Sequence, residues 1–362
     1  MHRRTFMQAM AAAGLAAGIS PAMAQDGLTL RQKAARMLLM GFIGDNLDTD
    51  GARGVAAHLE AGRIGGVLFL RHNVRSREGV EGMTAAFGDI APNAWMAVDQ
   101  EGGVVQRLSS DLGYTAIPRA FVISEERSVD EAHVLYEAAA AEFRAAGFNL
   151  NLAPVADLQD DSNGVIGRWG RGYGTDGDRI AAYAGAFIDA FESAGAACAI
   201  KHFPGHGRSR GDSHQGFVDI SETWSDAELD PFRRLIDAGR AHLIMGGHLT
   251  HEGLDPAGDP VTFSHPILTG LLRHQMGYTG ALITDDLDMG AIRENYDQRT
   301  AVIRSIQAGN DMVMMSNSAA PDPDLPIRFA DWIEAAVETG ELTELRINQS
   351  MARLNVLEGR IG

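Results

Sequence analysis

Short apolar runs recur along the chain and alternate with stretches of helical periodicity. Eight runs have the length and composition of buried strands. Ser128 and Glu131 form a capping box that marks the start of one of the helical stretches. The predicted strands cover residues 38–42, 65–70, 94–98, 149–155, 196–200, 242–246, 280–284 and 312–315, and the clearest predicted helices cover 31–37, 128–143, 179–193, 227–238, 268–275 and 300–308.

This alternation predicts a parallel sheet covered by helices. Eight strand–helix units over about 310 residues fit a closed (β/α)8 TIM-type barrel better than an open sheet. No linker rich in proline or serine interrupts the pattern, so we expect an α/β fold with a single domain over residues 25–362. Active sites of such barrels lie at the carboxyl ends of the strands.

The first 24 residues differ from the rest of the chain. A basic start with Arg3 and Arg4 precedes an apolar run over residues 9–19, and Ala22-Met23-Ala24 follows. This pattern predicts a secretory signal peptide cut after Ala24, and the paired arginines resemble the twin-arginine type. A membrane anchor is the alternative, but the run is short for a bilayer. We expect a periplasmic or secreted protein with no membrane span in the mature chain.

Composition narrows the classes of partner. The formal net charge is −17 over 362 residues, and it becomes −19 once Arg3 and Arg4 are removed. Such a charge argues against binding to nucleic acid or to anionic membrane surfaces. The one cysteine, Cys198, lies in an apolar run and is expected to be a core residue.

Polar and titratable residues gather where the predicted strands end. The densest group spans residues 201–214, where Pro204 and Gly205 break any helix and so predict a loop. Titratable side chains at the junction of a buried strand and a loop suggest a site. The groups at the predicted strand ends are Asp99, Glu101, Asp157, Lys201, His202, His248, Asp285 and Asp286.

Residues 201–207 (Lys-His-Phe-Pro-Gly-His-Gly), followed by Asp-Ser-His at 212–214, resemble a motif of glycoside hydrolase family 3. Within that family the resemblance is to the single-domain bacterial β-N-acetylglucosaminidase branch. It covers roughly residues 30–355. Four further stretches are similar in order and spacing: residues 99–103 with 106–107, 151–157, 245–248 and 283–289.

Retaining hydrolysis of a β-glycoside needs a nucleophile on one face of the sugar and a proton donor on the other. Asp285 ends a predicted strand at the barrel mouth, and the resemblance selects it as nucleophile; the alternative is that it caps the next helix. Asp286 should face the other way if the strand alternates that far. The resemblance implies that His214, paired with Asp212 on a loop, is the acid and base. Glycines beside this pair, such as Gly205, are placed where a hinge would be expected.

The resemblance also implies a set of sugar contacts. Lys201 and His202 become ligands of the sugar hydroxyls, and Asp99 and Arg107 become further contacts. Arg171 resembles a sugar-binding arginine of the family. Arg168 competes for that role, and a purely structural salt bridge remains an alternative for either arginine.

The predicted activity is that of a β-N-acetylhexosaminidase that removes terminal β-linked N-acetylglucosamine from peptidoglycan fragments. The protein is expected to be a monomer. No metal or organic cofactor is implied, because Pro204-Gly205 prevents the helix that a zinc-binding His-x-x-x-His motif needs. Val104, where family members often carry arginine, and a longer segment at 167–171 depart from the family pattern. These departures bear on the preference for the leaving group.

Three alternatives stay open. Another β-glycosidase, such as a glucosidase or xylosidase, would share the fold, although such members usually carry a second domain. A glycoside phosphorylase is possible because a neutral histidine tolerates an incoming phosphate better than a carboxylate does. A periplasmic sugar-binding protein without turnover belongs to a different class, but binding alone needs neither Asp285 nor His214.

Overall fold

The computed structural model describes residues 27–211 and 216–361. All eight predicted strands are present, and every residue of the strands as observed is buried. The predicted signal peptide lies outside the described residues. The eight strands are β1 (Leu38–Gly41), β2 (Gly66–Phe69), β3 (Trp95–Val98), β6 (Leu150–Asn151), β7 (Ala197–Phe203), β9 (Leu243–Gly246), β11 (Ala281–Thr284) and β12 (Val313–Met315).

These strands form one parallel sheet in the order β11-β9-β7-β6-β3-β2-β1-β12. Apart from β12, which lies beside β1, the strands follow the order of the chain around the sheet. The two edges meet through a parallel bridge between Ile283 of β11 and Met312, the residue before β12. The sheet therefore closes into a barrel, and the predicted (β/α)8 single-domain fold is confirmed.

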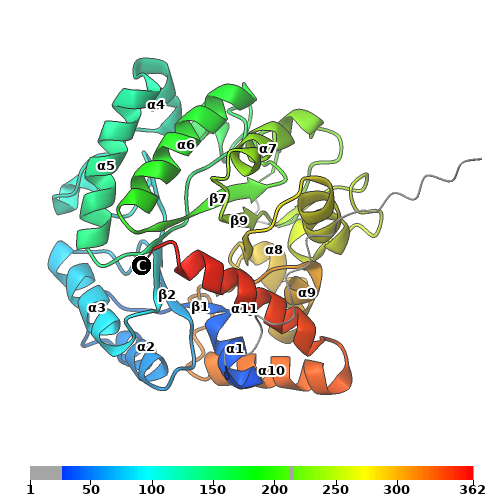
Figure 1. Cartoon of the computed structure of the whole chain (residues 1–362). Coiled ribbons are helices and arrows are strands. Elements are labelled where there is room, and N and C mark those ends of the chain that lie inside the picture. Colours follow the sequence, from blue (N-terminus) through cyan, green and yellow to red (C-terminus); the bar gives the residue numbers. More distant parts are fainter. Residues whose placement is uncertain (1–26, 212–215, 362) are drawn as a thin grey trace, which may run out of the picture.

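Helices surround the strands (Figure 1). The capping box is present, because Ser128 Oγ accepts a hydrogen bond from the N–H of Glu131 and the Glu131 carboxylate accepts one from the N–H of Ser128. The segment after β9 winds as a π-helix, η6 (Pro266–Gln275). The α-helices are α1 (Leu30–Arg36), α2 (Asp50–Glu60), α3 (Arg77–Ile90), α4 (Ala120–Glu126), α5 (Val129–Ala145), α6 (Gly177–Ser193), α7 (Asp230–Asp237), α8 (Gly290–Arg293), α9 (Gln298–Ala308), α10 (Leu325–Thr339) and α11 (Glu344–Glu358).

Aromatic side chains hold the helical layer together on one side of the barrel. Tyr136 of α5 packs edge-on against Phe187 of α6, with ring centroids 4.9 Å apart. Phe143 and Phe191 repeat the contact at 5.3 Å. Cys198 of β7 is buried beneath this layer, as expected for a core residue.

The first and last helices close the barrel against each other. In Figure 1, α1 (blue) lies beside α10 and α11 (orange and red). Lys33 Nζ donates to Asn348 Oδ1 over 2.8 Å, and Arg36 pairs with Glu358 at 2.7 Å. Because these contacts join elements more than 300 residues apart, they close the fold between its two ends.

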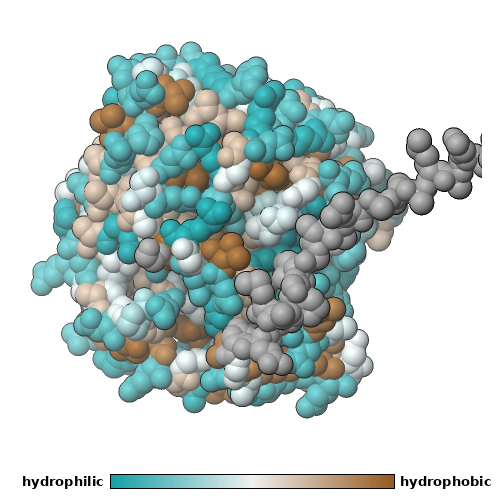
Figure 2. All heavy atoms as spheres, viewed as in Figure 1, coloured by the Kyte–Doolittle hydropathy of each residue, from teal (hydrophilic) through white to brown (hydrophobic). Residues whose placement is uncertain are grey.

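Polar residues cover most of the face seen in Figure 2, and apolar residues appear there only as small patches. Among the helices of residues 27–211 and 216–361, none has the length and apolar character needed to cross a membrane.

Candidate active site

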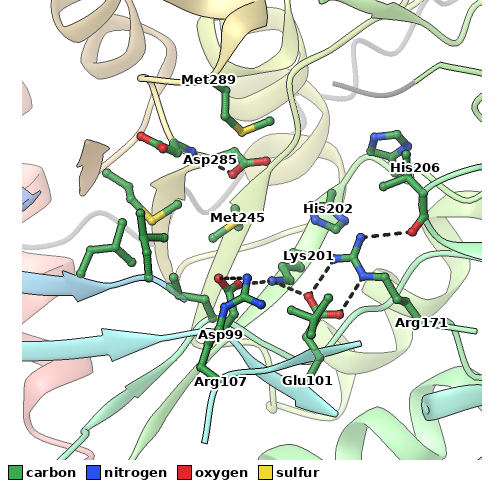
Figure 3. Close-up of a pocket in the computed structure, with 17 residues that line it drawn as sticks. Asp99, Glu101, Arg107, Arg171, Lys201, His202, His206, Met245, Asp285 and Met289 are labelled. Carbon is green, nitrogen blue, oxygen red and sulfur yellow. Dashed lines mark hydrogen bonds and ion pairs between the residues drawn. The ribbon is translucent and has the colours of Figure 1, made fainter. Parts of the chain in front are cut away.

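A cavity of about 270 Å³ opens at the carboxyl ends of the barrel strands. Figure 3 shows Asp285 and Met289 on one side of it and a charged group around Asp99 and Glu101 on the other. The predicted site residues that the structure describes all line this cavity: Asp99, Arg107, Arg171, Lys201, His202 and Asp285.

A tight hairpin after β3 positions the acidic residues of the cavity. Strands β4 (Gln100–Gly102) and β5 (Val105–Gln106) pair antiparallel across a turn at Gly103 and Val104. Gly102 and Gly103 have φ of 109° and 56°, which side chains rarely adopt. A Cβ at Gly102 would also lie 2.6 Å from the carbonyl oxygen of Pro118. The glycine pair therefore folds the chain back and leaves Asp99 and Glu101 at the cavity.

A bulge in β7 brings two consecutive side chains to the same cavity. Between Ile200 and Phe203 the register with β9 shifts, with three steps along β7 against two along β9. Neighbours on a regular strand point to opposite faces, and an extra residue interrupts that alternation. Lys201 and His202 consequently both line the cavity.

Lys201 and Arg171 are held by two carboxylates, the buried Glu101 and the partly buried Asp99. Lys201 Nζ lies 2.8 Å from Asp99 Oδ1 and 2.7 Å from Glu101 Oε1. Arg171 grips both oxygens of Glu101, with Nε–Oε2 at 2.8 Å and Nη2–Oε1 at 2.7 Å. Arg107 Nη2 lies 3.6 Å from the second oxygen of Asp99. The group therefore has three cations on two carboxylates, in fixed geometry.

Charge pairing outweighs burial for this group. Burial disfavours ionisation of Glu101, but the charges of Arg171 and Lys201 hold its pKa well below the usual range. Burial likewise lowers the pKa of Lys201, and the charges of Asp99 and Glu101 more than reverse it, so its pKa is raised. Both side chains stay charged at neutral pH.

Asp157 fixes His202 from behind. Its carboxylate is fully buried and lies 2.6 Å from His202 Nδ1, and it accepts hydrogen bonds from the backbone N–H groups of His202 and His206. Burial raises the pKa of Asp157, but the charge and hydrogen bonds of the two histidines bring it below its ordinary value. Since an ionised carboxylate only accepts, Nδ1 of His202 is the donor.

Asp285 follows the last residue of β11 and is ionised. Burial raises its pKa, but the charges of His248 and His202, the N–H of Asp286 and the charge of Lys201 together lower it below the usual value. His248 is itself held by Thr262 Oγ1 at 2.7 Å and the carbonyl oxygen of Asp286 at 2.9 Å. An anionic oxygen at a sugar-sized cavity can act as a nucleophile or hold a cation.

Asp286 also borders the cavity, and the direction of its side chain relative to that of Asp285 stays a prediction. The alternation of β11 ends at Thr284, one residue before Asp285. The Asp286 carboxylate accepts hydrogen bonds from the N–H groups of Ser316 and Asp288. Burial raises its pKa to about 6. The two adjacent carboxyl groups thus titrate apart, with Asp285 the more acidic.

The comparisons with known proteins all indicate the same family. The family model described as Glycosyl hydrolase family 3 N terminal domain matches residues 29–357. The chain belongs to glycosyl hydrolase family 3. A β-hexosaminidase of Nitrosomonas eutropha is 33% identical over 309 residues, which is 82% of this chain and 86% of the relative. The β-hexosaminidase LpqI of Mycobacterium tuberculosis is 32% identical over 92% of this chain and 83% of its own length.

Solved structures of family 3 have the same fold. A family 3 β-N-acetylglucosaminidase from Paenibacillus superposes with a TM-score of 0.83 at 31% identity; the match covers 92% of this chain but 63% of that one. A β-N-acetylhexosaminidase from Beutenbergia cavernae gives 0.79 at 27% identity, over 92% and 99% of the two chains. Family membership makes this chain a glycoside hydrolase.

The family 3 resemblance left two arginines in competition, and the structure separates their positions. Arg171 lines the cavity with its guanidinium on Glu101. Arg168 is exposed and stacks over the ring of Trp169, 5.1 Å from its centroid. Arg171 does form a salt bridge, with Glu101, and it also lines the cavity.

Two predicted residues of the family 3 pattern, Asp212 and His214, lie outside the described residues. Three residues at the site received no role from sequence alone: Glu101, Asp157 and His248. Each follows a predicted strand end and lies in a stretch that resembles the family, but neither signal gave it a role. Among the described residues, no group of three or more His, Cys, Asp or Glu side chains forms a metal site.

Proposed function

We propose that the protein is a retaining β-N-acetylhexosaminidase that removes terminal β-linked N-acetylglucosamine, with Asp285 as its nucleophile. The observation that carries the proposal is an ionised carboxylate after β11 across a cavity from a fixed cationic and acidic group. The names of the similar β-hexosaminidases support the same class of substrate.

The reaction proceeds in two displacements. Asp285 attacks the anomeric carbon, and the bond to the leaving oxygen breaks as His214, oriented by Asp212, gives that oxygen its proton. A glycosyl ester on Asp285 results. His214 then takes a proton from water, the water oxygen attacks the same carbon, and the ester bond breaks. Because each step inverts the carbon, the product keeps the β configuration.

The sugar hydroxyls are bound by the charged group on the other side of the cavity. Asp99 accepts from hydroxyls while Lys201 and Arg107 donate to them, and these residue types hold complementary roles. His202 presents its remaining ring nitrogen because Asp157 holds Nδ1. Arg171 holds Glu101 in place and so supports the same group of charged side chains. A volume of about 270 Å³ lies just below the range usual for small-molecule sites, which favours one sugar ring over a longer chain.

The natural substrate proposed is a fragment of peptidoglycan, which carries β-linked N-acetylglucosamine. This assignment agrees with the predicted export of the chain to the periplasm or the medium through its N-terminal signal. The protein is expected to act as a monomer.

The test is turnover of p-nitrophenyl N-acetyl-β-glucosaminide, with the corresponding glucoside and xyloside beside it. We expect the N-acetylglucosaminide to be the preferred substrate. Proton NMR should show the β-anomer as the first product. The reaction is run in phosphate and in a phosphate-free buffer, because release of sugar 1-phosphate would assign a phosphorylase instead.

A sugar-binding protein without activity predicts no turnover of any of the three glycosides by the wild type. The variant His214→Ala tests the proposed general acid. Loss of the general acid should slow glycosides with poor leaving groups far more than those with good ones, and azide should restore the rate. An equal loss for all leaving groups would contradict the role given to His214.

A further inference from the structure

One buried carboxyl group outside the cavity faces the loop that follows β7. Glu228 belongs to η4 (Asp226–Leu229), the short 3-10 helix before α7, and is 1% exposed. Buried glutamates are rare unless they are paired with a cation. No salt bridge to Glu228 occurs among the described residues, so its partners must be sought in the backbone.

Glu228 grips the first part of the loop, residues 204–209, which we call the loop base. Its Oε1 accepts a hydrogen bond from the N–H of Arg208 over 3.0 Å, and the N–H of Gly207 also acts on the carboxylate. Two successive backbone N–H groups directed at one carboxylate make a small anion-binding concavity. The side chain therefore takes over hydrogen bonds that the loop cannot make within itself.

Two neighbours of Glu228 bind the same loop base. Trp224 Nε1 donates to the carbonyl oxygen of Pro204 over 3.0 Å, and the guanidinium of Arg208 donates to Ser225 Oγ over 2.9 Å. Residues 224–228 thus hold the loop base at three points along its length.

Glu228 and the loop base are closely packed. A Cβ added at Gly205 would lie 2.5 Å from both Cβ and Oε2 of Glu228, and one at Gly207 would lie 2.2 Å from the carbonyl oxygen of Leu158. Both glycines therefore serve close packing here; their role as a hinge stays a prediction. Oε2 of Glu228 is buried without a hydrogen-bond partner among the described residues.

The opposite side of the loop base is fixed to the cavity wall. The N–H of His206 donates to Asp157, and Asn163 Nδ2 donates to the carbonyl oxygens of His206 and Ser209 over 2.8 Å each. Burial raises the pKa of Glu228 to about 7, Asp157 adds to the rise, and the N–H groups and charge of Arg208 oppose it. The loop base thus lies between Glu228 and the residues that hold His202.

We propose that Glu228 is a positioning residue for proton transfer, which sets the loop base and through it the approach of Asp212 and His214 to the leaving oxygen. The inference rests on the proposed function. It assigns different effects to two regions: the sugar contacts at the strand ends stay in place without Glu228, whereas the loop that carries the acid loses its support.

The experiment compares Glu228→Ala, Glu228→Asp and Glu228→Gln on aryl N-acetyl-β-glucosaminides of graded leaving-group pKa. Glu228→Ala should lower kcat about 10²-fold for a 4-methoxyphenyl leaving group and less than about 3-fold for 2,4-dinitrophenyl, because only the basic phenolate needs a proton. The inhibition constant of N-acetylglucosamine should stay within about 2-fold, since the sugar contacts lie elsewhere.

The conservative variants separate position from stability. Glu228→Gln keeps the length and an acceptor oxygen, and should keep kcat within about 3-fold of the wild type on both substrates. Glu228→Asp keeps the carboxyl group but is one methylene shorter, and should show the same dependence on leaving group as Glu228→Ala. If Glu228→Ala does not fold, the Asp and Gln pair decides. Asp226→Ala, on the exposed side of the same short helix, is the matched control.

Each outcome has one meaning. An equal loss on all leaving groups in Glu228→Ala and Glu228→Asp, beside a graded loss in His214→Ala, would overturn the role of Glu228 alone. A wild type without turnover, or a His214→Ala variant that keeps its full rate on the 4-methoxyphenyl substrate, would overturn the proposed function and this inference with it.

Discussion

Two buried ionic groups sit at opposite ends of the barrel, and only one of them borders the candidate site. At the amino end of β12, Asp311 is fully buried and takes Arg273, Arg346 and Arg353 at 2.8, 3.2 and 3.0 Å. At the carboxyl ends, Lys201 is paired with Asp99 and Glu101, and Asp285 faces this group across the cavity (Figure 3). The first group joins one carboxylate to three cations, and the second joins two carboxylates to one lysine.

The difference lies in what remains for a ligand. Both oxygens of Asp311 are taken by protein donors, which also include Ser350 Oγ and the N–H of Leu282. These contacts tie η6, α11 and β11 together. Asp285, by contrast, accepts one hydrogen bond among the described residues, from its neighbour Asp286. A buried charge therefore marks a site only where the protein leaves part of its hydrogen-bonding capacity unused and open to a cavity.

The substitution Asp285→Asn should have the largest effect on activity and tests the difference between the two groups most directly. We expect kcat on the p-nitrophenyl substrate to fall by about 10⁴-fold or more, because the nucleophile is lost. The free energy of unfolding should change by less than about 1 kcal/mol, since no protein group depends heavily on this carboxylate. Urea unfolding and single-turnover kinetics measure the two quantities. Retention of more than a tenth of the activity would remove Asp285 from its role.

Asp311→Asn should give the reverse result. Three guanidinium groups lose their counter-charge in the interior, and we expect the free energy of unfolding to fall by about 3–5 kcal/mol. The kcat of the protein that remains folded at 25 °C should stay within about 2-fold of the wild type, because Asp311 lies at the end of the barrel away from the cavity. A selective loss of kcat at unchanged stability would contradict the division between the two ends.

Glu228 offers an intermediate case, a buried carboxyl group without a cation of its own. Its pKa in the folded protein is about 7 against an ordinary value of 4.5. Between these values the unfolded chain releases the proton that the folded protein still holds, so the wild type loses stability as pH rises from about 4.5 to 7. Relative to Glu228→Gln, the loss should be about 3 kcal/mol. Parallel urea titrations across this range measure it, and a pH-independent difference would refute the assignment.

The smallest expected effects compare two arginines three positions apart. Arg171→Ala leaves Glu101 with Lys201 alone and should lower kcat/KM by about 10-fold to 10²-fold, the cost of a hydrogen bond to a charged group. Arg168→Ala removes a contact with an exposed tryptophan and should change kcat/KM less than about 2-fold. Similar losses in both variants would show that proximity to the cavity does not decide the role of the arginine.

The architecture was predictable because its signal is local and repeated. Each strand is buried on both faces and so appears as a short continuous apolar run, and titratable residues follow the carboxyl ends of β3, β6, β7, β9 and β11. The capping box at Ser128 and the burial of Cys198 followed from the same local patterns. Their confirmation needed no knowledge of long-range contacts.

The hydrogen bonds and ion pairs within the site were not predictable from the sequence, because they join residues that are distant in the chain. Glu101 meets Arg171 across 70 positions, and Asp157 meets His202 across 45. The prediction for Asp286 assumed that strand alternation continues past β11, whereas β11 ends at Thr284. Asp212 and His214 stay predictions, since they fall outside the described residues.

The bulge in β7 has a consequence for how the barrel mouth can vary. Odd and even positions along a strand face opposite sides of the sheet. The extra residue between Ile200 and Phe203 exchanges the two sides once, near the carboxyl end of β7. The pairing of Ala199 and Ile200 with β9 lies upstream and is untouched. One inserted or deleted residue at this point can therefore exchange which side chains face the sugar while the closed sheet below keeps its register, so substrate preference and barrel integrity can change independently.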